Sequence, residues 1–281
     1  MPILLSALIG LLAGLHAAAW GMYKDSLHEG FSVRRFVRSP LAGLAVGAAL
    51  GAITGWDPRD PAALVVAFGT GYVIERALAE VYKTFVREED QSKYAIPMQL
   101  SVLGRPVRSR AVRLAVGTAY LLVTGAVIWL VNALGREHAT PSLGLVLATG
   151  GLGGWISAFG GAWKDAPIEG FQPFKFLRSP AMATGYALLL MQLTAEPALI
   201  TLAATGLTIA TTETWKTFAF PSSPRGKFAG KPVHFPEMRR HRQRIVPLYA
   251  AIWVLVLASL VAGLAKSDAP RDAATIEAPH G

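Results

Sequence analysis

An eighteen-residue motif that occurs twice constrains the fold of this chain more than any other feature. The first copy is YKDSLHEGFSVRRFVRSP, residues 23–40, and the second is WKDAPIEGFQPFKFLRSP, residues 163–180. The copies are related by a constant offset of 140 without a gap, and nine of their eighteen positions are identical. Each copy joins two apolar segments. The repetition therefore predicts a chain built from two related units.

The apolar residues are gathered in long runs that contain few charges. Hydrophobic residues make up 52% of the chain and charged residues only 16%, whereas soluble domains carry about 25% charged residues. A helix of about 20 apolar residues crosses a bilayer. We therefore expect an all-α integral membrane protein with eight apolar helices, most of them transmembrane. The segments are 3–22, 40–56, 62–83, 111–134, 142–162, 180–194, 197–216 and 245–265.

Two of these segments, 40–56 and 180–194, are short for a crossing. Each either spans the membrane with the help of flanking residues or enters the membrane and turns back. The first segment, 3–22, resembles the hydrophobic part of a signal peptide. No basic region precedes it, however, and it stands in the same relation to its motif as 143–163 does to the second copy. We expect it to be retained as a helix.

A second repeated pattern sets the number of helices in each unit. The third apolar segment ends with EVYKTF, residues 80–85, and the seventh with ETWKTF, residues 213–218. A polar connection, a basic cluster and one further apolar helix follow each pattern. We therefore expect four-helix units at 1–135 and 136–266, followed by a disordered polar tail at 267–281. Since four is even, both units enter the membrane from the same side, which predicts parallel repeats about a pseudo-twofold axis along the membrane normal.

The distribution of charge predicts the orientation. The net charge is +9, and 22 of the 27 Lys and Arg residues lie in the connections 23–40, 83–113, 163–180 and 216–244. Basic residues accumulate on the cytoplasmic side of membrane proteins. We expect these connections to face the cytoplasm and anionic lipid headgroups, and both termini to face away, in a bacterial inner or plasma membrane. Because this rule accounts for the positive charge, nucleic acid is not an expected partner.

The charged residues of the first part of the motif are candidates for a ligand site. They are Lys24, Asp25 and Glu29 in the first copy and Lys164, Asp165 and Glu169 in the second. In one interpretation they form a turn, with glycine supplying a positive φ and Lys pairing with the adjacent Asp at the interface. In the other, the four carboxylates face the axis and form a cation or proton site or a gate, as ionisable residues at membrane depth often do.

The Arg-Ser-Pro triplet that closes each copy also has two interpretations. Ser39 and Ser179 stand where a helix is expected to begin, and serine is a favoured N-cap with proline in the first turn. Arg38 and Arg178 would then extend toward phosphate headgroups. Alternatively, these two arginines hold an anionic ligand.

The ends of the third and seventh segments supply four more charged candidates. Glu80 with Lys83, and Glu213 with Lys216, are spaced for ion pairs on one helix face. In the simplest interpretation each is a local ion pair. Alternatively, since the first and third helices of a unit end on the same side, each pair joins the Lys-Asp of its own unit in one polar cluster. Deeper in the third segment lies the pair Glu75-Arg76, which in the simplest interpretation belongs to a helix that extends into the cytosol.

Glycine spacing predicts how two of the helices pack. The second segment carries Gly43, Gly47 and Gly51 at intervals of four, and the first carries Gly10 and Gly14. In lipid, small residues let helix backbones approach closely. We expect close packing within the chain at these stripes rather than a dimer interface.

Several classes of function are not supported by the sequence. The chain has no cysteine, no His, Asp and Glu cluster with metal-ligand spacing, no Ser-His-Asp arrangement and no nucleotide-binding loop. We therefore predict no catalytic residue, metal or cofactor. The preferred function is a transporter or channel-like protein for a small solute or ion. The alternative is a membrane scaffold or assembly factor whose basic connections dock a protein partner or anionic lipid. An interfacial lipid-modifying enzyme, with a carboxylate as base, is a weaker alternative.

Overall fold

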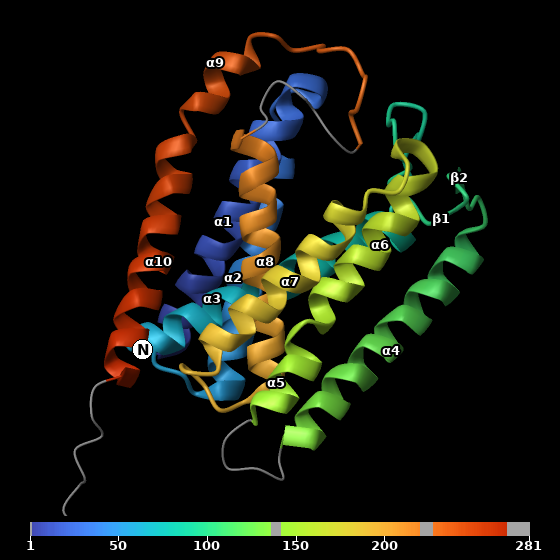
Figure 1. Cartoon of the computed structure of the whole chain (residues 1–281). Coiled ribbons are helices and arrows are strands. Elements are labelled where there is room, and N and C mark those ends of the chain that lie inside the picture. The colour runs from blue at the N-terminus through green and yellow to red at the C-terminus, as the bar shows by residue number, and fades with distance from the viewer. Residues whose placement is uncertain (1, 136–141, 220–226, 269–281) are drawn as a thin grey trace, which may run out of the picture.

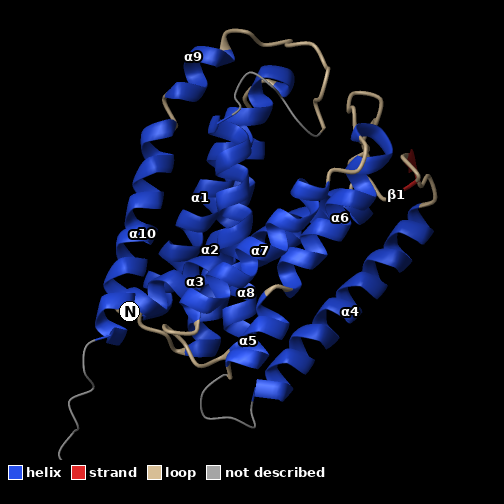
Figure 2. Cartoon of the chain, viewed as in Figure 1, coloured by secondary structure: helices blue, strands red, loops and turns tan. Residues whose placement is uncertain are grey.

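The computed structural model describes residues 2–135, 142–219 and 227–268, and these residues are almost entirely helical (Figures 1 and 2). The helices are α1 (Pro2–Glu29), α2 (Val33–Thr54), α3 (Pro61–Val81), α4 (Arg110–Gly135), α5 (Leu143–Gly150), α6 (Leu152–Glu169), α7 (Pro173–Leu190), α8 (Pro197–Thr214), α9 (Met238–Gln243) and α10 (Val246–Asp268). Two π-helical turns, η1 (Tyr82–Val86) and η2 (Trp215–Ala219), extend α3 and α8. A small hairpin pairs β1 (Ser101–Val102) with β2 (Arg105–Pro106).

Six helical stretches of the described chain are long and apolar enough to cross a membrane. They are Pro2–Glu29, Val33–Thr54, Pro61–Val86, Arg110–Gly135, Leu143–Glu169 and Met238–Ser267. They support an α-helical membrane protein. The expected segments 180–194 and 197–216 form α7 and α8, which are helical but are not among the six; α8 carries several threonines that lower its hydropathy. Eight crossings therefore stay a prediction, and the predicted disordered tail lies almost wholly outside the described residues.

The segment 142–162 is not the single helix that its hydropathy indicates. It is divided at Gly151 into α5 and α6. A cluster of glycines at this point lowers the local helix propensity, and kinks commonly occur at such positions. The break lets α6 follow a different direction from α5, as Figure 1 shows.

The two glycine stripes pack closely within the chain, as predicted, and they do so against each other. A Cβ atom on Gly10 of α1 would lie 2.1 Å from the carbonyl oxygen of Gly43 on α2. Likewise, a Cβ atom on Gly47 would lie 2.3 Å from the carbonyl oxygen of Ser6. Only glycine allows this approach, so the structure confirms intramolecular close packing as the role of the stripes.

The prediction that Ser39 and Ser179 are N-caps is wrong. Both serines lie inside helices, because α2 begins at Val33 and α7 at Pro173. Instead, the serine carbonyl touches the preceding helix: a Cβ atom on Gly14 would lie 2.2 Å from the oxygen of Ser39, and one on Gly154 would lie 2.5 Å from that of Ser179. The Ser-Pro pair marks a helix crossing, and the same contact recurs at the offset of 140.

Helices α3 and α8 cross at the centre of the molecule. A Cβ atom on Gly206 would lie 1.9 Å from the carbonyl oxygen of Gly69, and a Cβ atom on Gly69 would lie 2.7 Å from that of Ala203. The surrounding core is drawn from both helices, including Val65 of α3 and Leu207 of α8, which are almost fully buried. This crossing joins the part of the chain that contains the first motif copy to the part that contains the second.

The helices α4 and α10 lie on opposite sides of the molecule in Figure 1. Helix α10 packs against α3 and α1, with Gly263 next to Ala62. Helix α4 packs against η1 and also against α8, where Gly135 meets Pro197. The start of α1 and the end of α10 lie at the lower end of the molecule in Figure 1. The β-hairpin, α9 and the motif turns lie at the upper end. The basic connections are thus gathered at one end, opposite both described chain ends.

Candidate functional site

A cavity of 170 Å³ lies where the first motif copy meets α3 and η1, and we call it the N-terminal cavity. Asp25 and Glu29 at the end of α1 contribute its carboxylates. Six basic side chains also line it: Arg35, Arg38, Arg76, Lys83, Arg87 and Lys227. Basic residues therefore outnumber acidic ones on its wall.

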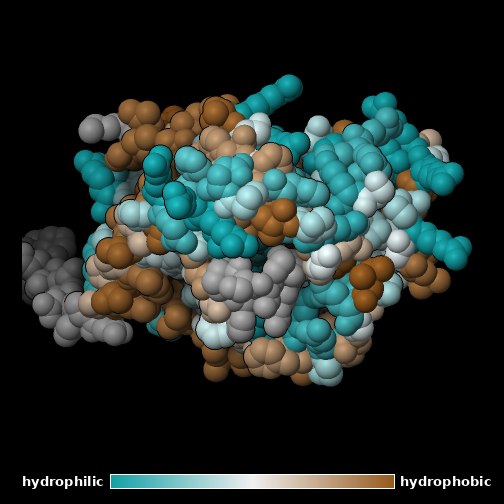
Figure 3. All heavy atoms as spheres, turned by 90° about the horizontal axis from the view of Figure 1, so that it is seen from above, coloured by the Kyte–Doolittle hydropathy of each residue, from teal (hydrophilic) through white to brown (hydrophobic). Residues whose placement is uncertain are grey.

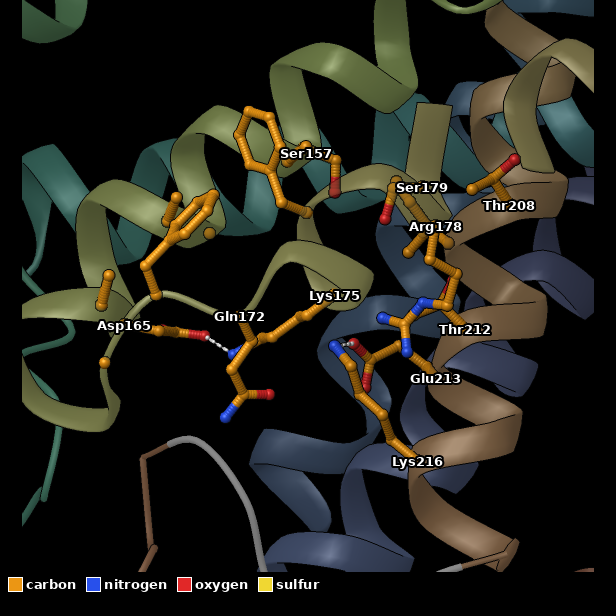
Figure 4. Close-up of a pocket in the computed structure, with 18 residues that line it drawn as sticks. Ser157, Asp165, Gln172, Lys175, Arg178, Ser179, Thr208, Thr212, Glu213 and Lys216 are labelled. Atoms are coloured by element: carbon orange, nitrogen blue, oxygen red, sulfur yellow. Dashed lines mark hydrogen bonds and ion pairs between the residues drawn. The ribbon is translucent and has the colours of Figure 1, made fainter. Parts of the chain in front are cut away.

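A second cavity of 140 Å³ lies where the second motif copy meets α8 and η2, and we call it the C-terminal cavity (Figure 4). Its charged lining consists of the carboxylates Asp165 and Glu213 and the cations Lys175, Arg178 and Lys216. The threonine Thr208 also lines it; this side chain is 2% exposed, and its hydroxyl has no hydrogen-bond partner among the described residues. The C-terminal cavity is therefore nearly balanced in charge and offers a free buried hydroxyl.

The two cavities are built from corresponding positions. Every motif residue from α6 and α7 that lines the C-terminal cavity has its counterpart, 140 positions earlier, in the lining of the N-terminal cavity. Examples are Asp165 with Asp25 and Arg178 with Arg38. On the third wall the offset is 133, so that Lys216 corresponds to Lys83. The duplicated sequence thus folds into duplicated cavities.

The glycine of each motif copy shapes the turn that closes its cavity. Gly30 has φ of 69° and Gly170 has φ of 79°, in the region that residues with a side chain rarely adopt. The positive φ ends the preceding helix and turns the chain into α2 or α7. The predicted role of these two glycines is confirmed.

The carboxylates of each motif copy form ion pairs with lysines or arginines. Asp25 is 2.8 Å from Lys227, and Glu29 is 2.8 Å from Arg35. In the second copy Lys175 pairs with both carboxylates: its Nζ lies 2.7 Å from Asp165 and 3.2 Å from Glu169. Each carboxylate pair is neutralised within its own cavity, because a lysine or arginine reaches it there. No group of three or more His, Asp or Glu side chains among the described residues is arranged to hold a metal ion.

The motif lysines interact with glutamates in the opposite half of the chain. Lys24 on α1 does not pair with the adjacent Asp25; its Nζ lies 3.7 Å from Oε2 of Glu213 on α8. The corresponding Lys164 on α6 interacts electrostatically with Glu80 on α3. We call these two interactions the crossed pairs. The predicted cluster paired Lys24 with Glu80 of the same unit. Lys24 instead forms its ion pair with Glu213 of the other half, because the α3–α8 crossing brings that glutamate close.

Each glutamate of the crossed pairs also contacts the lysine three residues later. Nζ of Lys83 lies 2.5 Å from Glu80, and Nζ of Lys216 lies 3.1 Å from Glu213, which confirms the predicted spacing. Both lysines belong to the π-helical turns η1 and η2. Such turns are rare and often occur at functional sites. Their occurrence at matching positions indicates that the sequence pattern selects this local geometry.

The pair Glu75-Arg76 is buried and does not lie on a cytosolic extension. The guanidinium of Arg76 contacts both carboxylate oxygens of Glu75, at 2.7 and 3.0 Å, and Glu75 is 1% exposed. Arg76 also lies over the ring of Trp20 and approaches Ser39. The corresponding positions on α8 are Thr208 and Ile209. A charged pair thus fills the N-terminal cavity wall where the C-terminal cavity keeps its free hydroxyl.

The basic connections pack against the helices of the opposite motif copy. Trp163 on α6 donates to the carbonyl of Ser101 in the β-hairpin connection, and the amide of Phe235 donates to the carbonyl of Leu27 on α1. Burial raises the pKa of Glu89 in the first connection, but hydrogen bonds from Lys93 and Tyr94 outweigh it and leave that pKa below its usual value. Burial, with the nearby Glu29, raises the pKa of the Tyr94 phenol. Glu89 is therefore ionised and structural.

Sequence reasoning missed a buried aromatic network beneath the N-terminal cavity. His16 is fully buried and stacks on Tyr249 at 4.1 Å between ring centroids. Its Nδ1 lies 3.2 Å from the hydroxyl of Tyr72, which also accepts a hydrogen bond from Trp20 at 2.8 Å. The only signal in the sequence was a histidine inside an apolar segment. Its partners come from α1, α3 and α10, which only the fold brings together.

Replacing Tyr72 with phenylalanine is expected to lower stability. The variant keeps the ring but leaves the indole N–H of Trp20 without its acceptor, and an unsatisfied buried donor costs about 1–3 kcal/mol. The measurement is thermal unfolding of the purified protein in detergent. Tyr120→Phe on α4 is the matched control, because that side chain is exposed. Equal melting temperatures of the Tyr72→Phe and Tyr120→Phe variants would contradict the role given to the Tyr72 hydroxyl.

No protein-family model matches this chain, and no curated protein or solved structure is significantly similar to it. The function must therefore be argued from the site.

Proposed function

We propose that this protein is a membrane transporter for a small ionic solute, built from two four-helix units at 1–135 and 136–266. The observations that carry the proposal are the two corresponding cavities and the crossed pairs between the two halves of the chain. Many transporters are built from internal repeats with their sites at the repeat interface. In this proposal the units are parallel and related by a pseudo-twofold axis along the membrane normal, which passes near the α3–α8 crossing.

The crossed pairs give the proposed transporter a way to couple its units. Lys24 belongs to one unit and Glu213 to the other, so any rocking of one unit against the other changes the 3.7 Å separation of their charged groups. The closely packed backbones at Gly69 and Gly206 lie between the cavities and serve as the fulcrum. Breaking the crossed pairs then favours the state in which the units separate at the end of the basic connections.

The cavities suit a small ligand that carries charge. Both are lined by carboxylates together with lysines and arginines, and the free hydroxyl of Thr208 supplies a further hydrogen-bonding group. Their end of the molecule holds the basic connections, which we assign to the cytoplasmic side of a bacterial inner or plasma membrane. Both termini then lie on the other side.

The two alternative functions fit the contacts less well. A scaffold needs connections that are available to a partner, but those at 87–109 and 227–237 are engaged within the chain through Ser101 and Phe235. An enzyme needs a carboxylate that is able to accept a proton. The cavity carboxylates Asp25, Asp165 and Glu213 are each already engaged in a salt bridge with a lysine.

Thiol labelling tests the transport proposal directly. Because the chain has no cysteine, single cysteines can be introduced without removing native ones. We expect the variant T208C to react with a membrane-impermeant maleimide from both faces, in right-side-out and in inverted vesicles. Q172C at the motif turn and S267C at the end of α10 are the controls. Each should react from a single face, Q172C from the face of the basic connections and S267C from the other.

The crossed pairs supply a second arm of the same experiment. Adding Lys24→Gln and Glu213→Gln to T208C is expected to increase labelling from the face of the basic connections several-fold. The physical reason is that the crossed pairs hold the two units together at this end, so their removal favours the state in which the units separate there. Labelling of T208C from a single face, unchanged by the two substitutions, would refute alternating access and favour the scaffold.

A further inference from the structure

The N-terminal cavity adjoins an apolar groove, with which it shares three lining residues. The groove has a volume of 480 Å³ and is lined by the apolar residues Met22, Phe31, Phe36, Met238, Ile245 and Leu248, with His241 and Arg244 on its wall. Three of these, Met22, Phe31 and Phe36, also line the N-terminal cavity. A polar cavity and an apolar groove therefore share one wall, which is the arrangement that an amphiphile requires.

The charges around this junction favour an anion. Five of the six basic side chains of the N-terminal cavity each contact a carboxylate: Arg35, Arg76, Lys83, Arg87 and Lys227. Arg38 instead lies over the ring of Tyr82, at 5.9 Å from its centroid, and makes no ion pair within the described residues. Arg244, which lines the groove, also makes no ion pair within the described residues. The cavity and the groove thus each contribute an arginine whose charge is not compensated by the described chain.

A buried hydroxyl provides a second and independent indication of a ligand. Ser26 lines the N-terminal cavity, is 2% exposed, and its hydroxyl has no hydrogen-bond partner among the described residues. A buried polar group without a partner is unfavourable. A headgroup oxygen in the cavity would accept its hydrogen bond. The hydroxyl and Arg38 therefore point to the same kind of ligand.

We propose that the N-terminal cavity and the apolar groove together bind a lipid with an anionic phosphate headgroup. The phosphate lies in the cavity against Arg38 and the hydroxyl of Ser26, and an acyl chain lies along the groove against Phe36 and Leu248. Arginine recognises phosphate through paired hydrogen bonds. Figure 3 shows the basic end of the molecule, where hydrophilic residues cover the face and apolar residues reach its edge on the side of α10. A lipid therefore reaches the site from the bilayer, and the site does not depend on the proposed transport.

Native mass spectrometry of the delipidated full-length protein tests the proposal with three probes. These are phosphatidylglycerol, zwitterionic phosphatidylcholine and inorganic phosphate. We expect the wild type to retain one phosphatidylglycerol molecule per chain and to release phosphatidylcholine at lower collision energy. Arg38→Gln should weaken the binding of phosphatidylglycerol about tenfold, since it removes a charge-assisted hydrogen bond.

Matched variants keep this experiment decisive. Arg178→Gln alters the corresponding position of the second motif copy and should change the affinity less than twofold. Leu248→Gln places an amide in the groove without altering the cavity. It should weaken the binding of the phospholipid and leave the binding of inorganic phosphate unchanged. Equal binding of phosphatidylglycerol to Arg38→Gln and to the wild type would overturn the proposal. Displacement of the lipid by inorganic phosphate alone, with Leu248→Gln behaving as the wild type, would also overturn it in favour of a soluble phosphate ligand.

Discussion

Replacing Glu75 with glutamine is expected to destabilise the protein by about 3–5 kcal/mol, because it leaves a buried arginine without its counter-charge. Glu75 is 1% exposed, and the side chain of Arg76 is 12% exposed. Glu75 is the one carboxylate among the described residues that forms a salt bridge with Arg76. The measurement is equilibrium unfolding in mixed detergent micelles, followed by tryptophan fluorescence.

The duplicated sequence itself supplies the control for this substitution. The corresponding positions on α8 are Thr208 and Ile209, so the double variant Glu75→Thr/Arg76→Ile gives α3 the residues that α8 already carries. Removing both members of a buried ion pair is often nearly neutral. We therefore expect the double variant to recover most of the lost stability. A double variant as unstable as Glu75→Gln would show that the pair does more than neutralise its own charges.

Replacing Gly206 with valine is expected to prevent correct packing of α3 on α8. Its Cβ atom would lie 1.9 Å from the carbonyl oxygen of Gly69. A backbone oxygen cannot turn away as a side chain can, so the two helices must separate. Overpacking costs about 1–3 kcal/mol in ordinary cores and more where the backbone must move. We expect the yield of monodisperse protein in size-exclusion chromatography to fall sharply.

Two glycines outside the crossing are the controls for this variant. Gly185 on α7 and Gly125 on α4 have open space where a Cβ would lie. Valine at either position should leave the elution profile and the melting temperature close to those of the wild type. If Gly206→Val behaves like these controls, the α3–α8 contact is not the fulcrum that the transport proposal requires.

Much of the local structure follows from the sequence because it depends on neighbouring residues. Apolar runs form helices, and the glycine after Glu29 ends α1 with a positive φ in both copies. The spacing of Glu80 and Lys83 places both on one helix face. The fixed offset between the motif copies also makes the two cavities alike, since equal sequences in equal local settings fold in the same way.

The remaining features depend on contacts between residues far apart in the chain. Whether Lys24 meets Glu80 or Glu213 is decided by how closely α3 and α8 cross, which two glycines allow. The N-cap prediction for Ser39 failed because α2 begins at Val33, within the polar residues that precede the apolar segment. The apolar groove exists only because α10 returns to the first motif copy. The sequence alone determined the helices and their repeated polar groups, and the tertiary structure decided which groups meet, because helix crossings are set by packing over the whole chain.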